Sequence, residues 1–173
     1  FRVVDADRLV ADLYQPGEPG ARAIRDAFGP EVMTPEGGVD HRKLGSVVFQ
    51  DRQARKRVEE IVHPLVRERF REIAETASEP VVVLEATLLV EAGYPPDFDH
   101  VVTVEAPAEI RLQRAVDRGN DPADAKRRLA AQGDGAQRRT VADFVLVNDG
   151  SLAELEAKVE AVAERLLRED RGE

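Results

Sequence analysis

Four short apolar segments, separated by stretches with helical periodicity, constrain the fold of this chain more than any other feature of its sequence. They are residues 2–5, 81–85, 100–105 and 144–147. Each is nearly continuous in apolar residues rather than alternating with polar ones, a pattern typical of parallel strands buried on both faces. Strands that alternate with helices predict an α/β fold of three layers, with helices on both faces of a parallel sheet.

Helical patterns fill the segments between the apolar runs. We expect helices at about residues 8–14, 21–28, 40–49, 51–77 and 107–118, another starting at Asp121-Pro122, and a final one from about residue 152. The helix at 51–77 should be broken or bent at His63-Pro64, because proline removes a backbone donor. The final helix should close the core with five apolar residues on one face. These residues are Leu152, Leu155, Val159, Val162 and Leu166.

The composition limits the class of protein. With 173 residues, 42% hydrophobic and 34% charged, the chain suits one globular domain spanning residues 1–173. No segment approaches the roughly 20 apolar residues of a membrane span and no secretory signal opens the chain, so we expect a cytoplasmic protein without membrane contact. The absence of cysteine and of closely spaced histidines argues against disulfides and zinc. The net charge of −9 argues against nucleic-acid binding.

Two carboxylates, Asp5 and Asp7, follow the first apolar run. The C-terminal ends of parallel strands form the edge at which α/β proteins bind ligands. A carboxylate there can accept a hydroxyl proton or help to hold a metal ion. Aspartate before a helix also caps the free N–H groups of the first turn, so the sequence leaves a catalytic and a capping role open.

A cluster of arginines marks residues 111–139. Its members are Arg111, Arg114, Arg118, Arg127, Arg128, Arg138 and Arg139, around a glycine-containing stretch at 132–135. Arginines carried on a mobile lid neutralise charge and exclude water in phosphoryl transfer, which makes this segment a candidate lid. Single arginines also commonly occupy solvated helix faces, and that alternative stays open for each of them.

Several short stretches, taken in order, resemble the dephospho-coenzyme A kinase family over nearly the whole chain. In the first half they are Val3-Val4-Asp5-Ala6-Asp7, the Pro16-Gly17 turn, Asp40-His41-Arg42-Lys43-Leu44 and His63-Pro64. In the second half they are Leu88-Leu89-Val90-Glu91, Arg114 with Arg118, Arg128-Leu129-Ala130-Ala131-Gln132, Ala142-Asp143 and Asn148-Asp149-Gly150-Ser151. The resemblance rests on their order and spacing rather than on any one of them.

This resemblance implies a P-loop kinase with a sheet like that of nucleoside monophosphate kinases. The implied reaction transfers the γ-phosphoryl group of ATP, with Mg²⁺, to the 3′-hydroxyl of dephospho-CoA, the last step of coenzyme A synthesis. It also implies a helical acceptor-binding region at about residues 16–78 and a lid at about 111–139. The partners would be the small molecules dephospho-CoA and ATP, bound by a monomer or small homo-oligomer.

The resemblance assigns roles to individual residues. Asp7 resembles the carboxylate that accepts or orients the proton of the 3′-hydroxyl, and Asp5 occupies the first position of the same motif. Arg138 would contact the ATP phosphates in the transition state. The other assignments are Arg114, Arg118 and Asn148 on the ATP side, and Arg42 and His63 on the acceptor side. His63 is equally a candidate for a packed, hydrogen-bonded structural histidine.

The sequence also departs from the family pattern. Thr87, Gly133 and Val147 stand where relatives have a proline, a bulkier residue and an acidic residue. Nowhere do the 173 residues read Gly-x-x-x-x-Gly-Lys-Ser/Thr, the phosphate-binding loop that the resemblance places before the first apolar run. We therefore expect an N-terminally incomplete domain, short of about one strand–loop–helix unit, that is inactive and unstable by itself.

Two alternatives stay open at the level of the sequence. A different P-loop nucleotide or nucleoside kinase would share the sheet and the lid but accept a mononucleotide. A chain that has lost its phosphate loop would instead be a non-catalytic remnant that binds a CoA-like ligand or a partner protein. Competing acceptors in one assay separates the first alternative from dephospho-CoA kinase.

Overall fold

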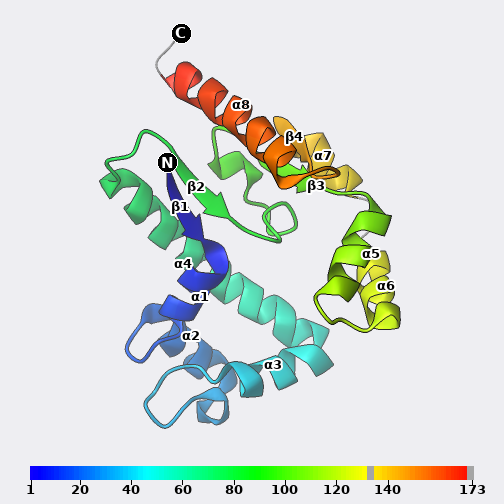
Figure 1. Ribbon diagram of the computed structural model, residues 1–173. Coiled ribbons are helices and arrows are strands. Elements are labelled where there is room, and N and C mark those ends of the chain that lie inside the picture. The colour runs from blue at the N-terminus through cyan, green and yellow to red at the C-terminus, as the bar shows by residue number, and fades with distance from the viewer. Residues whose placement is uncertain (132–134, 171–173) are drawn as a thin grey trace. The chain divides into compact units, whose positions relative to one another are not determined.

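The computed structural model describes residues 1–131 and 135–170, and the chain divides into two compact units (Figure 1). Unit 1 comprises Phe1–Leu88 and unit 2 comprises Leu89–Glu173. Each unit contains one pair of parallel strands together with helices. Gly133, one of the departures from the family pattern, lies outside the described residues, as do its neighbours 132 and 134 in the candidate lid.

In unit 1, helices connect the two strands of a parallel pair. The elements are β1 (Arg2–Asp5), α1 (Ala6–Leu13), α2 (Pro19–Phe28), the 3-10 helix η1 (Pro30–Val32), α3 (His41–Gln50), α4 (Arg52–Thr76) and β2 (Val82–Glu85). Arg2 lies opposite Val82 and Asp5 opposite Glu85. A long crossover of this kind is what a parallel pair requires, since a tight hairpin can join only antiparallel strands.

Aspartate begins three of the helices in unit 1. The side chains of Asp5, Asp40 and Asp51 accept backbone N–H groups in the first turns of α1, α3 and α4. These groups have no partner inside the helix, so each cap stabilises a helix start. At Asp40 the N–H of Lys43 is the main cause of a lowered pKa, which keeps the capping carboxylate ionised.

Two helices differ from the sequence expectation. Capping by Asp5 starts α1 at Ala6, so Asp7 lies in the first helical turn rather than at the end of a strand. Of the two outcomes expected at His63-Pro64, a break or a bend, the break is wrong, because α4 runs unbroken over 25 residues with Pro64 inside it. Val62 and Val66 on either side of Pro64 are buried, and α4 packs against α1, α2 and α3. That packing outweighs the roughly 3 kcal/mol cost of an internal proline.

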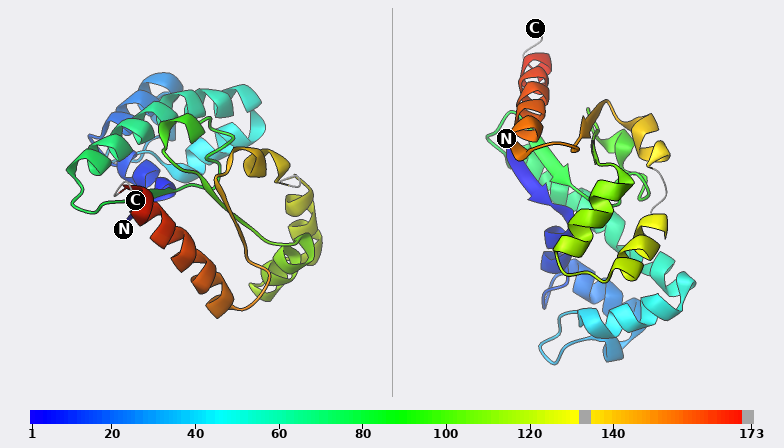
Figure 2. Two further views of the ribbon diagram at one scale, coloured as in Figure 1. Left: turned by 90° about the horizontal axis from the view of Figure 1, so that it is seen from above. Right: turned by 45° about the vertical axis from the view of Figure 1, so that its right-hand side comes forward.

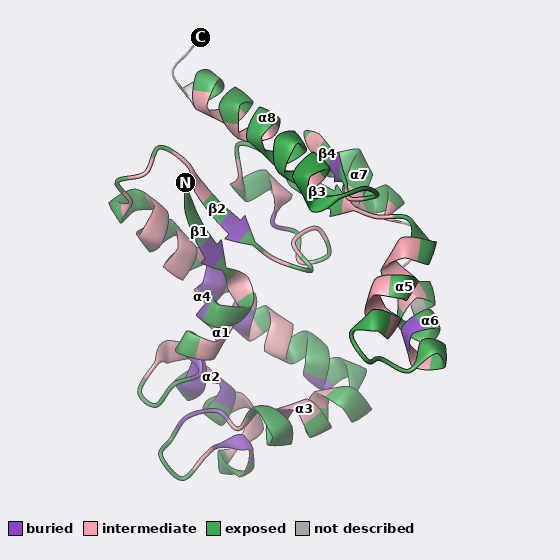
Figure 3. Cartoon of the chain, viewed as in Figure 1, coloured by how far each residue is buried: buried purple, intermediate pink, exposed green. Residues whose placement is uncertain are grey.

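The core of unit 1 lies mainly where α4 packs against α1, α2 and α3 (Figure 3). Its buried apolar residues include Leu9, Leu13, Ile24, Val62 and Val66. α1 and α2 approach so closely at Gly20 that a Cβ atom there would lie 2.6 Å from the carbonyl oxygen of Leu13. The helices that carry Asp7 and His63 therefore share one core.

Unit 2 is built around a second parallel pair. Its elements are the 3-10 helix η2 (Pro95–Asp97), β3 (Val102–Glu105), α5 (Ala108–Asp117), α6 (Pro122–Ala131), α7 (Ala136–Val141), β4 (Phe144–Val147) and α8 (Leu152–Asp170). Val102 lies opposite Phe144 and Glu105 opposite Val147. The carboxylate of Asp143 accepts the N–H of Val101 at 2.7 Å and so ties the two strands together where they begin. α5 and α6 lie side by side in all views (Figure 2).

The apolar face expected on the final helix covers the unit only in part. Leu155, Val162 and Leu166 are half-buried, but Leu152 and Val159 are exposed. Aromatic and charged contacts attach the far end of α8 instead. The guanidinium of Arg165 lies 4.9 Å from the ring centroid of Phe144, and Nε2 of His100 lies 3.0 Å from a carboxylate oxygen of Glu169. Half-buried apolar residues and these two contacts thus hold α8 to β4 and to the residue pair before β3.

The strands are less buried than their apolar composition predicts. Val3 of β1 is 63% exposed and Val104 of β3 is 61% exposed. Within the described residues each sheet has only two strands, so one edge and part of one face of each strand lack a neighbour. Among the residues that the structure describes, no helix is both long and apolar enough to cross a membrane.

Candidate active site

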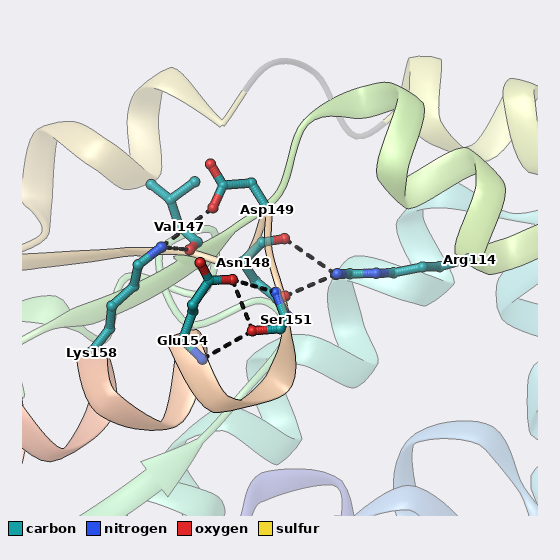
Figure 4. Close-up of polar contacts among 7 residues, drawn as sticks. All are labelled: Arg114, Val147, Asn148, Asp149, Ser151, Glu154 and Lys158. Atoms are coloured by element: carbon teal, nitrogen blue, oxygen red, sulfur yellow. Dashed lines mark hydrogen bonds and ion pairs between the residues drawn. The ribbon is translucent and has the colours of Figure 1, made fainter.

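Arg114 and Asn148, both assigned to the ATP side from the sequence, meet in unit 2 (Figure 4). Asn148 follows β4, and its N–H donates to the carbonyl oxygen of Glu105, at the end of β3, at 2.7 Å. Arg114 on α5 donates from Nη1 to the carbonyl oxygen of Asn148 at 3.3 Å and from Nη2 to its Oδ1 at 3.0 Å. Both residues are half-buried. The planar guanidinium therefore fixes the backbone and the side chain of Asn148 together, at the C-terminal edge of the strand pair.

The residues on either side of Asn148 are held from α8. Nζ of Lys158 donates to the carbonyl oxygen of Val147 at 2.6 Å and lies 3.3 Å from Oδ1 of Asp149. The ammonium group thus satisfies a carbonyl at the end of β4 and a carboxylate of the following turn. Together with Arg114, it anchors the Asn148 turn from two different helices (Figure 4).

A capping box closes this turn and begins α8. Oε2 of Glu154 accepts the N–H of Ser151 at 2.7 Å and its hydroxyl at 2.8 Å, while the hydroxyl oxygen accepts the N–H of Glu154 at 3.3 Å. The backbone and side-chain hydrogen bonds of Ser151 lower the pKa of Glu154. A Cβ atom at Gly150 would collide with the Glu154 carboxylate, so glycine suits this position sterically.

The short helix α7 presents two successive arginines to carboxylates of two different segments. Arg138 donates from Nε and Nη2 to one oxygen, Oε1 of Glu91, at 3.0 and 2.6 Å. Arg139 donates from Nη1 to Oε2 of Glu105 at 2.8 Å. Partial burial raises the pKa of Glu91, but the hydrogen bond from Arg138 and that from its own backbone outweigh this effect and lower it. The two ion pairs orient a helix that buries no side chain of its own.

Arg118 lies one turn beyond Arg114, at the C-terminal cap of α5, and is exposed. Its guanidinium makes no hydrogen bond or ion pair within the described part of the chain. Arg111, one turn before Arg114, buries its Nε without a hydrogen-bond partner among the described residues. The spacing places all three arginines along one side of α5. An exposed guanidinium with five N–H donors is well suited to receive phosphate oxygens.

The two carboxylates at the end of β1 have different environments. Oδ1 of Asp5 accepts the N–H of Asp7 at 2.8 Å and that of Arg8 at 3.3 Å, so Asp5 acts as an N-cap. Asp7 is exposed in the first turn of α1, and no described residue hydrogen-bonds to its carboxylate. A negative charge there is stabilised by the N-terminal end of the helix dipole. Among the described residues, both oxygens of Asp7 are therefore without a hydrogen-bond donor, whereas Asp5 uses Oδ1 as the cap and leaves only Oδ2.

Arg42 and His63 lie on neighbouring helices of unit 1. Arg42 is exposed in the first turn of α3, where its backbone N–H donates to Oδ1 of Asp40 at 3.0 Å. His63 is half-buried in α4. Burial is the main cause of its lowered pKa; Glu59 opposes this shift and Arg67 adds to it. The neutral imidazole, which can both donate and accept a hydrogen bond, is therefore the favoured form.

The eight residues proposed from the sequence thus fall into two groups of four. Unit 1 carries Asp5, Asp7, Arg42 and His63, and unit 2 carries Arg114, Arg118, Arg138 and Asn148. Direct contact joins Arg114 to Asn148, and the Asp5 side chain to the backbone of Asp7. The first group contains the residues assigned to the acceptor and the second those assigned to ATP.

Lys158 and Glu91 of unit 2 are among the polar residues that escaped the sequence assignment. Lys158 has no motif around it, and nothing in the sequence connects it with Val147. Glu91 lies in a stretch that carries the family resemblance, Leu88-Leu89-Val90-Glu91, but its partner Arg138 is 47 residues away. The stretch itself was the signal that could have identified Glu91.

A divalent cation requires side chains that can coordinate it. Among the described residues, no group of three or more aspartate, glutamate, histidine or cysteine side chains could hold a metal ion. Kinases, however, usually bind Mg²⁺ through one or two carboxylates plus the phosphates of the substrate. The exposed carboxylate of Asp7 fits such a minor share in holding an ion that arrives with a nucleotide.

The parallel strand pairs, the Asn148 turn at their C-terminal edge and the arginines of α5 and α7 are features of an α/β phosphotransferase. The chain belongs to the dephospho-CoA kinase family: the family model described as "Dephospho-CoA kinase" matches residues 1–154. Asp5, Asp7 and Asn148 all lie inside the matched segment. The resemblance identified from the sequence is confirmed.

Individual relatives agree with the family match. A dephospho-CoA kinase of Frankia casuarinae is 42% identical over 166 residues, which are 95% of this chain and 72% of that protein. One of Streptomyces avermitilis is 43% identical over 159 residues, 91% of this chain and 78% of that protein. Among solved structures, TT1252 from Thermus thermophilus is 34% identical with a TM-score of 0.77, covering 96% of this chain and 85% of that one. These matches confirm the α/β kinase fold.

Proposed function

We propose that this protein transfers the γ-phosphoryl group of ATP to the 3′-hydroxyl of dephospho-CoA. The family match over residues 1–154 carries this proposal, because it includes all eight residues assigned to the two substrates. The structure adds an exposed carboxylate at Asp7 and arginines in unit 2 whose guanidinium groups keep unused N–H donors. Phosphoryl transfer depends on this combination of a residue that orients the nucleophile and cations that neutralise charge.

Unit 1 would supply the chemistry at the acceptor. Asp7 would accept or orient the proton of the 3′-hydroxyl, since its carboxylate is exposed and takes no part in capping, whereas Oδ1 of Asp5 caps α1. Arg42 offers an exposed guanidinium at the start of α3 for the phosphates of the acceptor. His63 would support the acceptor region as a neutral, half-buried imidazole.

Unit 2 would bind ATP and stabilise the charge that develops on its phosphates. Arg114 holds the turn at Asn148, and this turn would receive the adenine. Arg118 and Arg138 would contribute guanidinium N–H groups to phosphate oxygens. Such preorganised cations stabilise the transition state more than the ground state, which is the condition for faster chemistry.

Mg²⁺ would enter as the complex with ATP, in which it neutralises phosphate charge. We assign no protein ligand to the ion. The protein would act in the cytoplasm on small molecules only, as a monomer or small homo-oligomer, without binding nucleic acid or membranes.

The test is an acceptor comparison with the protein expressed from its natural gene. Release of ADP is followed with dephospho-CoA, AMP or CMP as acceptor, and the product is identified by ³¹P NMR. A 3′-phosphomonoester formed from dephospho-CoA supports the proposal. Turnover of a mononucleotide alone would identify a different nucleotide kinase, and binding of dephospho-CoA without turnover would identify a non-catalytic binding protein.

A further inference from the structure

The ion pair between Glu91 and Arg138 uses one particular edge of the guanidinium. Both hydrogen bonds, at 3.0 and 2.6 Å, come from the edge formed by Nε and Nη2, and both end on Oε1 of Glu91. A guanidinium has five N–H donors in a rigid plane. Both N–H groups of Nη1 and one of Nη2 are therefore not used by Glu91, and no other described residue accepts them.

We infer that Glu91 is a positioning residue that holds the side-on edge of Arg138, so that the opposite end of the guanidinium is presented to a phosphate group. This inference rests on the proposed function, because it assigns a purpose to the orientation of Arg138 in phosphoryl transfer. Nothing in the geometry requires Arg138 to release Glu91 before it binds an anion, since the two edges of the guanidinium are distinct.

The environment of the pair supports a fixed orientation. The side chain of Arg138 is 28% exposed and that of Glu91 41%, so solvent competes with the pair only in part. The hydrogen bond from Arg138 helps to lower the pKa of Glu91, so the carboxylate is charged wherever the enzyme would operate. Hydrogen bonds between two charged groups are the stronger class, and an arginine held by two of them has little rotational freedom.

Anchoring of α7 alone would not need Glu91. The neighbouring pair of Arg139 and Glu105, at 2.8 Å, already ties α7 to the end of β3. Glu105 is therefore the matched comparison: its loss removes an ion pair of the same chemistry from the same helix, one residue away, without touching Arg138.

The test is a double-mutant cycle on Glu91 and Arg138 in the protein expressed from its natural gene. We expect Glu91→Ala to lower kcat about 10- to 100-fold, as for the loss of hydrogen bonds to a charged group, with KM for dephospho-CoA changed less than about twofold. Glu91→Gln keeps an acceptor oxygen at the same distance and should recover part of the loss. Glu105→Gln should lower kcat less than about threefold. In the Arg138→Ala variant, the additional substitution Glu91→Ala should not lower kcat further.

Two outcomes would overturn the inference. If Glu91→Ala lowers kcat as much in the Arg138→Ala variant as in the unaltered protein, Glu91 acts independently of Arg138. Equal losses for Glu91→Gln and Glu105→Gln, with matching falls in melting temperature, would reduce Glu91 to a helix anchor.

A second readout separates this inference from the proposed function. The ¹⁵N–¹H signal of Nε in Arg138, assigned through its absence in Arg138→Lys, should be sharp and slow to exchange with water, and should broaden in Glu91→Ala. If dephospho-CoA is not phosphorylated, the proposed function fails, but this signal still decides whether Glu91 fixes Arg138. A signal unchanged by Glu91→Ala would refute the positioning role in either case.

Discussion

Arg114 contacts Asn148 at two points, with Nη1 on its carbonyl oxygen and Nη2 on its Oδ1, at 3.3 and 3.0 Å. One guanidinium plane thus orients a peptide group and an amide side chain at once. Lysine at the same position would offer a single ammonium centre and could not copy this geometry. Among the contacts that hold the turn we assign to the adenine of ATP, this side chain is the one that fixes Asn148 itself.

We therefore expect Arg114→Lys to weaken ATP binding about tenfold, the effect of losing one hydrogen bond to a charged group. Isothermal titration with ATP measures the change. Gln113→Ala is the matched control, because Gln113 lies on the same helix and, within the described residues, its side chain hydrogen-bonds only to Asp117. An affinity equal in both variants would remove Arg114 from the nucleotide site.

Asp7→Asn tests the carboxylate in the first turn of α1. Loss of a general base lowers turnover by about 10²- to 10⁴-fold, and ATP affinity should change little because we assign Asp7 to the acceptor. Steady-state kinetics with varied dephospho-CoA and direct ATP titration measure the two effects. Asp12→Asn, a substitution at another exposed aspartate of the same helix, should leave turnover within about twofold. Full activity of Asp7→Asn would contradict its role as the base.

Asp5 should affect stability before it affects catalysis. Asp5→Ala removes the cap of α1 and should lower the free energy of unfolding by about 0.5–2 kcal/mol, as for other N-cap deletions. Asp5→Asn retains a capping oxygen and should restore most of this loss. Urea unfolding followed by circular dichroism measures both. If Asp5→Ala and Asp5→Asn unfold at the same urea concentration, the hydrogen bonds of Asp5 to Asp7 and Arg8 do not stabilise the protein.

His63 should make stability fall as the solution becomes acidic. Its pKa in the folded protein lies below the ordinary 6.5, mainly because of burial, with Arg67 adding to and Glu59 opposing the shift. Below about pH 6.5 the unfolded chain therefore binds a proton that the folded chain resists, so stability decreases as pH falls through the folded pKa. His63→Gln, which does not titrate, should lose less stability between about pH 7.5 and 5 than the unaltered protein.

Urea unfolding at both pH values gives, for each protein, the change in the free energy of unfolding between them. Subtracting the change of the His63→Gln variant from that of the unaltered protein removes the contribution of the histidines and carboxylates that both proteins share. A decrease in stability of the same size in both would mean that the burial of His63 has no energetic weight.

The strands were predictable from the sequence almost residue by residue. Arg2–Asp5 and Phe144–Val147 stand as expected, because continuous β-branched and apolar runs have few other stable uses in a chain rich in helices. The α4 helix shows that local sequence patterns do not always predict where a helix ends. Pro64 predicts a break, but the buried residues Val62 and Val66 belong to a tertiary core that local sequence does not reveal.

The site was predictable in its residue types and less so in its contacts. Arg114 and Asn148 were assigned to the same ligand, and they do touch. Whether Asp5 or Asp7 caps the helix depends on where α1 begins, which sequence patterns locate only to within a few residues. Glu91 escaped because an ion pair across 47 residues leaves no periodic trace in either partner.

The division of the chain between Leu88 and Leu89 has a consequence for how such an enzyme can diversify. A recombination joint at this point would cut neither described strand pair, because β1 with β2 and β3 with β4 each lie wholly on one side of it. Chimaeras that exchange the first segment with another kinase would keep every residue assigned to ATP. The joint would exchange the four residues assigned to the acceptor and retain the four assigned to ATP, but the phosphate-binding loop that the family resemblance places before β1 would be exchanged as well.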